Sequence, residues 1–230
     1  MKPKKIFLIR HGQSEGNLNH MVYGEKPDYK LLLTDLGQEQ ALQAGKNLIQ
    51  LIEPNSNLMF YVSPLWRTRQ TFEGVLESFN PVSYIWREDP RIREQEWGHL
   101  RDAAECDLVE KEREKFGTFY YRIPDGESCA DVYDRVSDFF NTLHRDFEKT
   151  DFPENCVIIT HGTAIRCILM RWFHWTVEQF ESTANPKNCE IFQMNLNPNG
   201  KYDLITPLVK KEIAEEDSFK WKNPCKSIIL

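Results

Sequence analysis

The stretch that decides the fold is Ile6-Phe7-Leu8-Ile9-Arg10-His11-Gly12, close to the amino terminus. Four successive apolar residues predict a buried strand of a sheet. The residues that follow bring a guanidinium group, an imidazole and a flexible glycine turn to one edge of that sheet. An Arg-His-Gly triplet is a weak motif by itself. Its meaning therefore depends on what the rest of the chain places beside it.

Length and composition restrict the class of protein. The 230 residues suffice for one well-buried core, so we expect a single α/β domain over residues 1–209 and a charged tail over 210–230. A net charge of −6 provides no field that would attract nucleic acid or an acidic membrane. The first apolar run is too short for a secretion signal, and no run reaches the roughly 20 residues of a transmembrane helix. We therefore expect a cytoplasmic protein without nucleic-acid or membrane partners; the oligomeric state stays open.

Cysteine and histidine spacing argues against disulfides and metal sites. No two cysteines form a Cys-x-x-Cys pair, and we expect all six to be free thiols: Cys106, Cys129, Cys156, Cys167, Cys189 and Cys225. The six histidines include no His-x-x-x-His pair. No metal and no other cofactor is therefore expected.

Apolar periodicity predicts strands that alternate with helices. Strands are expected over residues 6–10, 58–62, 82–86 and 155–160, with two edge strands in 189–195 and 202–209. Helices are expected over 38–52 after an N-cap at Thr34, from an N-cap at Ser63 towards Phe79, over 102–115 as a solvated surface helix, over 128–147, and over 164–173. This alternation predicts parallel βαβ units and a three-layer α/β/α sandwich.

Several cationic residues follow the predicted strands directly. Arg10 and His11 end the first strand, Arg67 opens the helix after the second, and His161 follows the fourth. Because ligands bind beyond the carboxyl ends of parallel strands, these residues are expected at one rim. Guanidinium forks and helix amino-terminal amides, such as those of Gly162 and Thr163, suit a phosphate dianion.

The same set of residues suits covalent phosphoryl transfer. A neutral His11 can take a phosphoryl group from an ester and pass it to water, while a protonated His161 donates to a phosphate oxygen. The leaving alkoxide needs a proton from a carboxylic acid. Glu94, close to the apolar Trp97, is the candidate, and the sequence leaves Glu96 and Asp89 as alternatives.

Five segments, in the same order, resemble the motifs of the histidine phosphatase superfamily, the phosphoglycerate-mutase-like proteins. They are Arg10-His11-Gly12-Gln13-Ser14 with Asn17, residues 33–41, residues 63–71, Gly126-Glu127-Ser128 and Thr160-His161-Gly162. Residues 91–98 and 172–181 look most like a small group of plant and fungal members, whose fungal member is a broad-range acid phosphatase.

The resemblance implies a role for each candidate residue. It implies His11 as the phosphohistidine nucleophile, Glu94 as the proton donor, and a phosphate pocket made by Arg10, Arg67 and His161. It also implies a six-stranded, mostly parallel sheet and no metal. Further substrate contacts are expected at Ser14, Asn17, Tyr23, Gly24, Gly162 and Thr163.

Three functions are compatible with these residues. The first is a phosphomonoesterase that acts on a small phosphorylated substrate. The second is a phosphoglycerate mutase or sugar bisphosphatase, but the paired arginines with which true mutases grip a sugar acid are replaced by scattered cations: Arg101, Lys111, Arg113 and Arg122. The third is a phosphate-recognising scaffold without turnover, against which the presence of both histidines and both arginines argues.

Other polar residues have a simpler expected role. We expect Arg69 to be a surface or supporting cation, since only one of positions 67 and 69 can face the pocket from one helical turn. Glu127 is equally compatible with capping a helix and with a functional role. Structural roles are expected for His20, His99, His144 and His174.

Overall fold

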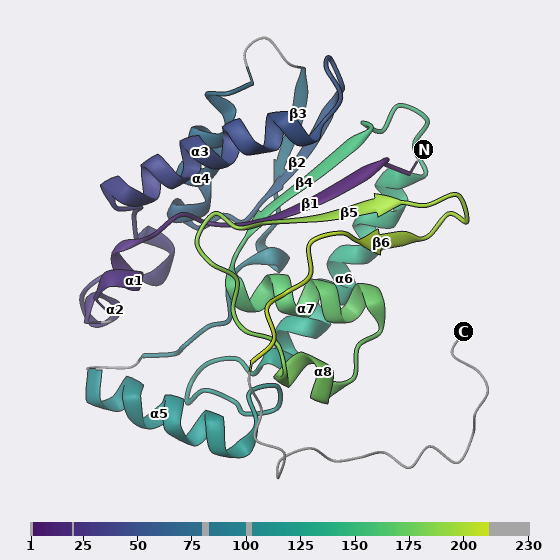
Figure 1. Ribbon diagram of the computed structural model, residues 1–230. Coiled ribbons are helices and arrows are strands. Elements are labelled where there is room, and N and C mark those ends of the chain that lie inside the picture. The colour runs from purple at the N-terminus through teal and green to yellow at the C-terminus, as the bar shows by residue number, and fades with distance from the viewer. Residues whose placement is uncertain (1, 20, 80–82, 100–102, 212–230) are drawn as a thin grey trace, which may run out of the picture.

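The computed structural model describes residues 2–19, 21–79, 83–99 and 103–211. A six-stranded sheet with the order β3-β2-β4-β1-β5-β6 lies between two layers of helices (Figure 1). The strands are β1 (Lys5–Arg10), β2 (Leu58–Val62), β3 (Tyr84–Glu88), β4 (Asn155–Thr160), β5 (Ile191–Leu196) and β6 (Tyr202–Leu204). The pairs β1–β4, β4–β2 and β2–β3 are parallel, and β5 is antiparallel to both of its neighbours. The predicted α/β/α sandwich with a mostly parallel sheet is confirmed.

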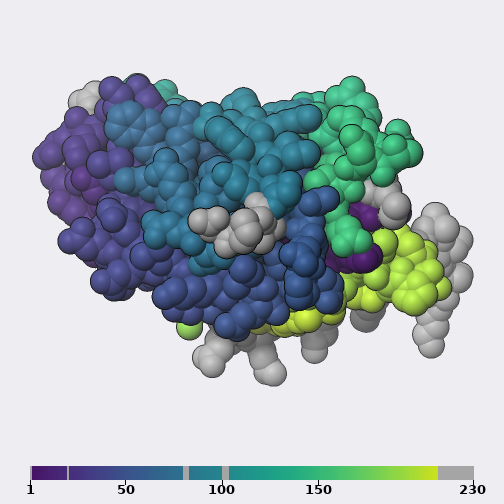
Figure 2. Space-filling model, turned by 90° about the horizontal axis from the view of Figure 1, so that it is seen from above, coloured from purple at the N-terminus to yellow at the C-terminus, as the bar shows by residue number. Residues whose placement is uncertain are grey.

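Helices of the two layers bury opposite faces of the sheet. The described helices are α1 (Glu15–Leu18), α2 (Val22–Glu25), α3 (Asp35–Leu51), α4 (Trp66–Leu76), α5 (Ala103–Phe116), α6 (Cys129–Phe147), α7 (Gly162–Phe173) and α8 (Val177–Glu181), with short 3-10 helices η1 (Asp28–Lys30) and η2 (Pro90–Ile92). Because side chains alternate along a strand, Phe7 and Ile9 pack against α3 and α4, while Ile6 and Leu8 pack against α6 and α7. The α3 and α4 layer (blue) covers the face seen from above in Figure 2.

The register of the sheet aligns the carboxyl ends of the central strands. Arg10 of β1 lies opposite Thr160 of β4, and Val62 of β2 lies opposite Ile159. The residues that leave these three strands therefore start from the same edge, as the sequence predicts.

Helix caps show where the sequence prediction held and where it was wrong. Thr34 caps α3 by accepting from the Gly37 amide at 3.0 Å, and Ser128 caps α6, as predicted. Ser63 does not cap α4, which begins at Trp66. The Ser63 amide instead continues the sheet by donating to the Ile159 carbonyl at 3.0 Å, so the helix starts later.

Two strand predictions were shifted or too long. β3 ends at Glu88 rather than at residue 86, because its five residues pair with the five residues of β2 up to Val62↔Glu88. Val82 lies outside the described residues, as do His20, Arg101 and Cys225. β6 ends at Leu204 instead of continuing to residue 209. Of the predicted tail, only Lys210 and Lys211 are described; Lys211 donates its amide to Ser182 at 2.7 Å.

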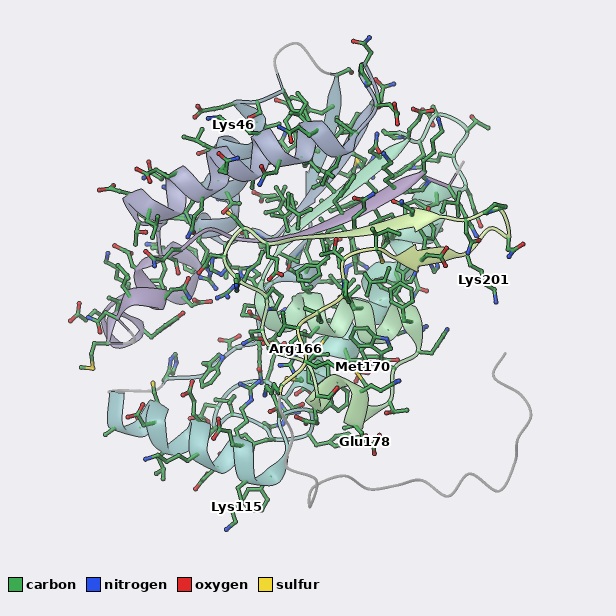
Figure 3. The ribbon with its side chains drawn as sticks, in the orientation of Figure 1. Lys46, Lys115, Arg166, Met170, Glu178 and Lys201 are labelled. Carbon is green, nitrogen blue, oxygen red and sulfur yellow. The ribbon has the colours of Figure 1, made fainter. Side chains whose placement is uncertain are left out.

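A buried cation of α7 was not singled out by the sequence. Arg166, labelled in Figure 3, donates to the Phe180 carbonyl at 2.9 Å and to the Thr183 hydroxyl at 3.0 Å. Its guanidinium lies 4.0 Å from the centroid of the Phe180 ring. Arg166 thereby ties α8 to α7, a packing role supported by cation–π attraction. No helix in the described part of the chain has the length and apolar composition to cross a membrane.

Candidate active site

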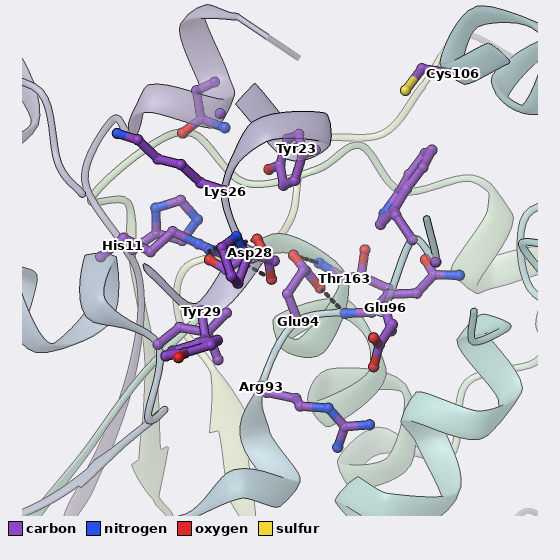
Figure 4. Close-up of a pocket in the computed structure, with 18 of the residues that line it drawn as sticks. His11, Tyr23, Lys26, Asp28, Tyr29, Arg93, Glu94, Glu96, Cys106 and Thr163 are labelled. Carbon is purple, nitrogen blue, oxygen red and sulfur yellow. Dashed lines mark hydrogen bonds and ion pairs between the residues drawn. The ribbon is translucent and has the colours of Figure 1, made fainter. Parts of the chain in front are cut away.

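A cavity of about 510 Å³ opens at the carboxyl ends of the central strands (Figure 4). Seven of the residues predicted for the site line it: Arg10, His11, Asn17, Tyr23, Arg67, Glu94 and Thr163. Four others, Ser14, Gly24, His161 and Gly162, are not in its lining. The structure therefore brings together residues from four distant segments of the chain, three of which follow the carboxyl ends of parallel strands.

His11 is held in one tautomer. Its side chain is buried, and Nδ1 lies 2.7 Å from the Gly12 carbonyl oxygen. A carbonyl can only accept, so Nδ1 carries the proton and the lone pair is on Nε2. Burial, followed by the charges of Arg67 and Arg10, lowers the pKa of His11 well below its ordinary value of 6.5. The imidazole is therefore neutral at pH 7, as a nucleophile must be.

The backbone around His11 is fixed by contacts from three elements. The His11 amide donates to the Thr160 carbonyl at 2.9 Å, and the His11 carbonyl accepts from the Asn188 side chain at 3.1 Å. The Gly12 amide donates to the Thr71 hydroxyl at 3.0 Å. A Cβ on Gly12 would overlap the carbonyl of Gly37, so glycine is needed here for a close approach rather than for flexibility.

His161 lies beneath His11 and is fully buried. The two ring centroids are 5.1 Å apart, and Nε2 of His161 lies 2.7 Å from the Ser63 hydroxyl. Nδ1 is buried and has no hydrogen-bond partner among the described residues. Burial, followed by the Arg67 charge, lowers the pKa of His161 well below 6.5. The sequence argument let His161 donate if it were protonated; the buried ring is neutral and can still donate through one nitrogen.

Arg67 is buried and already paired. Its Nη1 donates to Oδ1 of Asp28 at 2.8 Å and to the Asp28 carbonyl at 2.9 Å, and its Nη2 donates to Oδ2 at 3.2 Å. This bidentate carboxylate has the geometry that a phosphate would use on the same guanidinium. No local pattern in the sequence indicates Asp28, because the pair joins η1 to α4 across 39 positions. Arg69 instead pairs with Glu88 outside the cavity, as expected.

Arg10 supplies the second guanidinium. Its Nη1 donates to the Pro186 carbonyl at 2.5 Å, while its Nε is buried without a hydrogen-bond partner among the described residues. Burial lowers the pKa of Arg10, the Glu94 charge raises it and Arg67 lowers it further. Two close, largely desolvated cations create the positive potential that a dianion requires.

Glu94 reaches the first turn of α7. Its Oε2 accepts from the Thr163 amide at 3.2 Å, and its Oε1 accepts from the Gln95 amide at 2.9 Å (Figure 4). Glu96 also lines the cavity. The alternative Asp89 does not, because Arg91 binds both of its carboxylate oxygens at 2.9 and 2.6 Å.

The expected substrate contacts divide into two groups. Asn17 and Tyr23 line the cavity, and burial raises the pKa of Tyr23 to about 12. Ser14 is buried instead, and its hydroxyl lies 3.2 Å from the Asn17 side-chain oxygen, so it supports Asn17. Gly24 is exposed outside the cavity.

One wall of the cavity comes from α5, the segment that the sequence predicts to be a solvated surface helix. Cys106, Glu110 and Arg113 line the cavity from this helix. The Arg113 guanidinium lies 5.2 Å from the centroid of the Trp97 ring and donates to the Gln95 side chain at 2.8 Å. The helical spacing of positions 106, 110 and 113 was the available signal, but charged neighbours obscured it.

The five described cysteines form no disulfide bond. Within the described ranges, no group of three or more His, Cys, Asp or Glu side chains has an arrangement that would hold a metal ion.

Comparisons with known proteins agree with this arrangement. A sequence model of the histidine phosphatase superfamily (branch 1) matches residues 6–204. Phosphoglycerate mutase-like protein AT74 of Arabidopsis thaliana is 44% identical over 224 residues, covering 92% of this chain and 71% of that protein. Broad-range acid phosphatase DET1 of Saccharomyces cerevisiae is 30% identical over 309 residues, covering 94% of this chain and 92% of that protein.

A solved structure shows the same fold. The mycobacterial glucosyl-3-phosphoglycerate phosphatase in complex with VO3 superposes with a TM-score of 0.70 at 20% identity, covering 89% of this chain and 99% of that chain. The family match extends over nearly the whole described chain and includes every strand from β1 to β6. The chain therefore belongs to the histidine phosphatase superfamily, branch 1.

Proposed function

We propose that the protein is a phosphomonoesterase that transfers the phosphoryl group of a small phosphate ester to His11 and then to water. One observation carries this proposal: the Gly12 carbonyl holds the proton of His11 on Nδ1, which leaves Nε2 with its lone pair beside two arginines. Family membership and the named phosphatase among the relatives support the same reaction class.

In the first step, Nε2 of His11 bonds to phosphorus while the ester P–O bond breaks. The leaving oxygen takes a proton from the Glu94 carboxyl group. Arg10 and Arg67 stabilise the negative charge of the transferred group, and Nδ1 of His161 is the further donor beneath it. In the second step, water bonds to phosphorus, the P–N bond breaks, and the Glu94 carboxylate takes the proton of the water.

The position of Glu94 supports its role as the acid. Its carboxylate lies in the cavity lining and is tethered to the first turn of α7, the helix that directly follows His161. The same cavity is far larger than a phosphate group, so room remains for a leaving group, and Tyr29 and Trp97 are both in the lining. Both aromatic rings suit an organic leaving group.

The test is to trap the covalent intermediate. We expect wild-type protein to form an acid-labile phosphoenzyme with a labelled aryl phosphate, and His11→Ala to form none and to lose turnover by a factor of about 10⁴ or more. Full turnover by His11→Ala would overturn the proposal. No phosphoenzyme with any phosphate ester in a broad panel would favour the scaffold instead.

A mutase shares the nucleophile and differs in the acceptor. Of the scattered cations weighed above, only Arg113 among the described residues lines the cavity, whereas a carboxylated sugar acid in the true mutases is gripped by a pair. This favours hydrolysis. The two reactions are separated by what discharges the labelled phosphoenzyme. Discharge by water alone indicates a phosphatase, whereas discharge only after addition of a monophosphate indicates a mutase.

A further inference from the structure

Arg135 of α6 binds three carbonyl groups of the segment 91–94 and the carboxylate of Glu127. Its Nη1 donates to the carbonyls of Arg91 and Arg93 at 2.7 and 2.8 Å, and its Nη2 donates to the carbonyl of Glu94 at 2.9 Å. The remaining two donors bind the Glu127 carboxylate, from Nε at 3.1 Å and from Nη2 at 3.0 Å. All five N–H donors of the guanidinium are therefore satisfied, with only 11% of the side chain exposed.

Glu127 binds the same loop from the other side. Its carboxylate accepts from Nη2 of Arg93 at 2.6 Å and from the Glu96 amide at 3.1 Å. Its backbone amide donates to the Glu96 carbonyl at 2.9 Å, and its carbonyl accepts from the Gln95 side chain at 2.7 Å. The Arg135–Glu127 ion pair thus forms the support on which residues 93–96 rest.

Two backbone carbonyl groups of residues 93–96 depend on Arg135. These residues belong to no helix or strand, and among the described residues the carbonyls of Arg93 and Glu94 accept from no backbone amide. Their partner is Arg135. The direction in which the Glu94 side chain leaves the backbone therefore depends on the guanidinium fork.

We propose that Arg135 is the positioning residue of the proton donor, because its fork fixes the backbone of Glu94 so that the carboxyl group meets the leaving oxygen. The inference rests on the proposed function, in which Glu94 is the acid. Arg135 has no hydrogen bond to His11, Arg10 or Arg67, so loss of the fork affects protonation of the leaving group and spares phosphoryl capture.

The experiment compares esters with good and poor leaving groups. We would measure kcat/KM of Arg135→Lys and Arg135→Met on a series of aryl and alkyl phosphates. Good leaving groups need no acid, so those rates should stay within about threefold of wild type, while the poorest leaving groups should lose about 10- to 100-fold, part of the 10²–10⁴ that general acids contribute. The quantity compared is the kcat/KM for the best leaving group divided by the kcat/KM for the poorest. This ratio, taken within one variant, is independent of the fraction of the protein that is folded.

Arg135→Lys separates geometry from charge. The Arg135 charge is one of the causes that lower the pKa of His161. Lysine keeps that charge but has three donors and no planar fork. A raised ratio in Arg135→Lys therefore reports the lost fork rather than an altered His161.

Arg91→Met is the matched control. Arg91 lies at the start of the same loop, yet its side chain binds Asp89, Asp138 and Thr142, and no carbonyl of residues 93–96. Its removal should leave the ratio at the wild-type value.

Comparison with Glu94→Gln distinguishes the positioning role of Arg135 from the role of Glu94 as the acid. Glu94→Gln should raise the ratio most, and adding Arg135→Met to it should raise the ratio no further, because both act on one proton transfer. If Glu94→Gln raises the ratio and both Arg135 variants leave it unchanged, or lower all rates equally, the positioning role is wrong and the proposed function stands. If Glu94→Gln leaves the ratio unchanged, the assignment of the acid itself fails.

Discussion

At the scale of single residues, the pairing of Arg67 with Asp28 sets the resting state of the proposed phosphate pocket. The guanidinium is buried while the carboxylate is half exposed, so the fork is held in place by a group at the rim of the cavity. A phosphate dianion must share or replace that carboxylate. Asp28 therefore both orients Arg67 and competes with the ligand.

Asp28→Asn should strengthen the binding of inorganic phosphate. The amide can still accept one hydrogen bond, but the competing charge is gone, and we expect the inhibition constant of phosphate to fall by about threefold to tenfold, or about 1 kcal/mol. Product-inhibition kinetics at constant ionic strength measure this.

Glu88→Gln is the comparison for this prediction. Glu88 forms the same kind of bidentate pair with Arg69 on α4, at 2.5 and 2.8 Å, but outside the cavity. Its loss should leave phosphate inhibition unchanged. An unchanged or weaker affinity in Asp28→Asn would show that orientation of Arg67 outweighs competition.

At the scale of elements, α3 and α4 approach each other at a glycine. A Cβ on Gly45 would lie 2.5 Å from the Val75 carbonyl oxygen and 2.9 Å from the Ser78 hydroxyl. Close packing here keeps α4, and with it Arg67, against the sheet.

Gly45→Ala should therefore destabilise the fold. Alanine gains about 1 kcal/mol of helix propensity, but overlap with a backbone atom costs typically 1–3 kcal/mol and cannot be relieved by a side-chain rotation. We expect a net loss of up to about 2 kcal/mol in the free energy of unfolding, measured by urea denaturation. The neighbouring exposed Lys46→Ala should change it by less than about 0.5 kcal/mol, and equal effects of both substitutions would contradict the packing argument.

Elements also differ in how well their sequence predicts them. The fully buried β2 and β4 were predicted with their observed bounds, because a continuous apolar run identifies a strand that is covered on both faces. The exposed edge strand β3 was misplaced, since its residues carry no such run and its ends are set by pairing with β2.

At the scale of the whole molecule, the buried histidines couple stability to pH. The pKa values of His11 and His161 are well below 6.5 in the folded protein because of burial, so the unfolded chain binds protons first as pH falls. Stability is then complete above about pH 6.5 and falls below it, by as much as about 1.4 kcal/mol per pH unit for each histidine.

Urea titrations between about pH 5 and pH 8 test this coupling. Lowered carboxylate pKa values, such as that of Asp146, add to acid destabilisation only at lower pH, so the interval from about 5 to 6.5 isolates the histidines. His11→Asn should reduce the slope of the free energy of unfolding against pH in this interval by the equivalent of up to one bound proton. A free energy of unfolding that is constant across this interval would contradict it.

The sequence also predicted the site only in part. Residues that directly follow buried strands, such as Arg10, His11 and His161, were placed correctly, because topology alone brings strand ends together. Asp28, Arg113 and Arg135 were missed as contributors, since each acts through a contact between segments whose pairing no local pattern encodes. The supporting layer of the site depends on tertiary structure.

The position of β1 in the sheet has a consequence for synthesis of the chain. Lys5 pairs with Asn155 of β4 on one side and with Asn195 of β5 on the other. β1 precedes both of these partners in the chain, so it is synthesised before either of them. Its apolar residues therefore stay unpaired until β4 and β5 have been made, and the site at its carboxyl end forms only when these non-local pairings close.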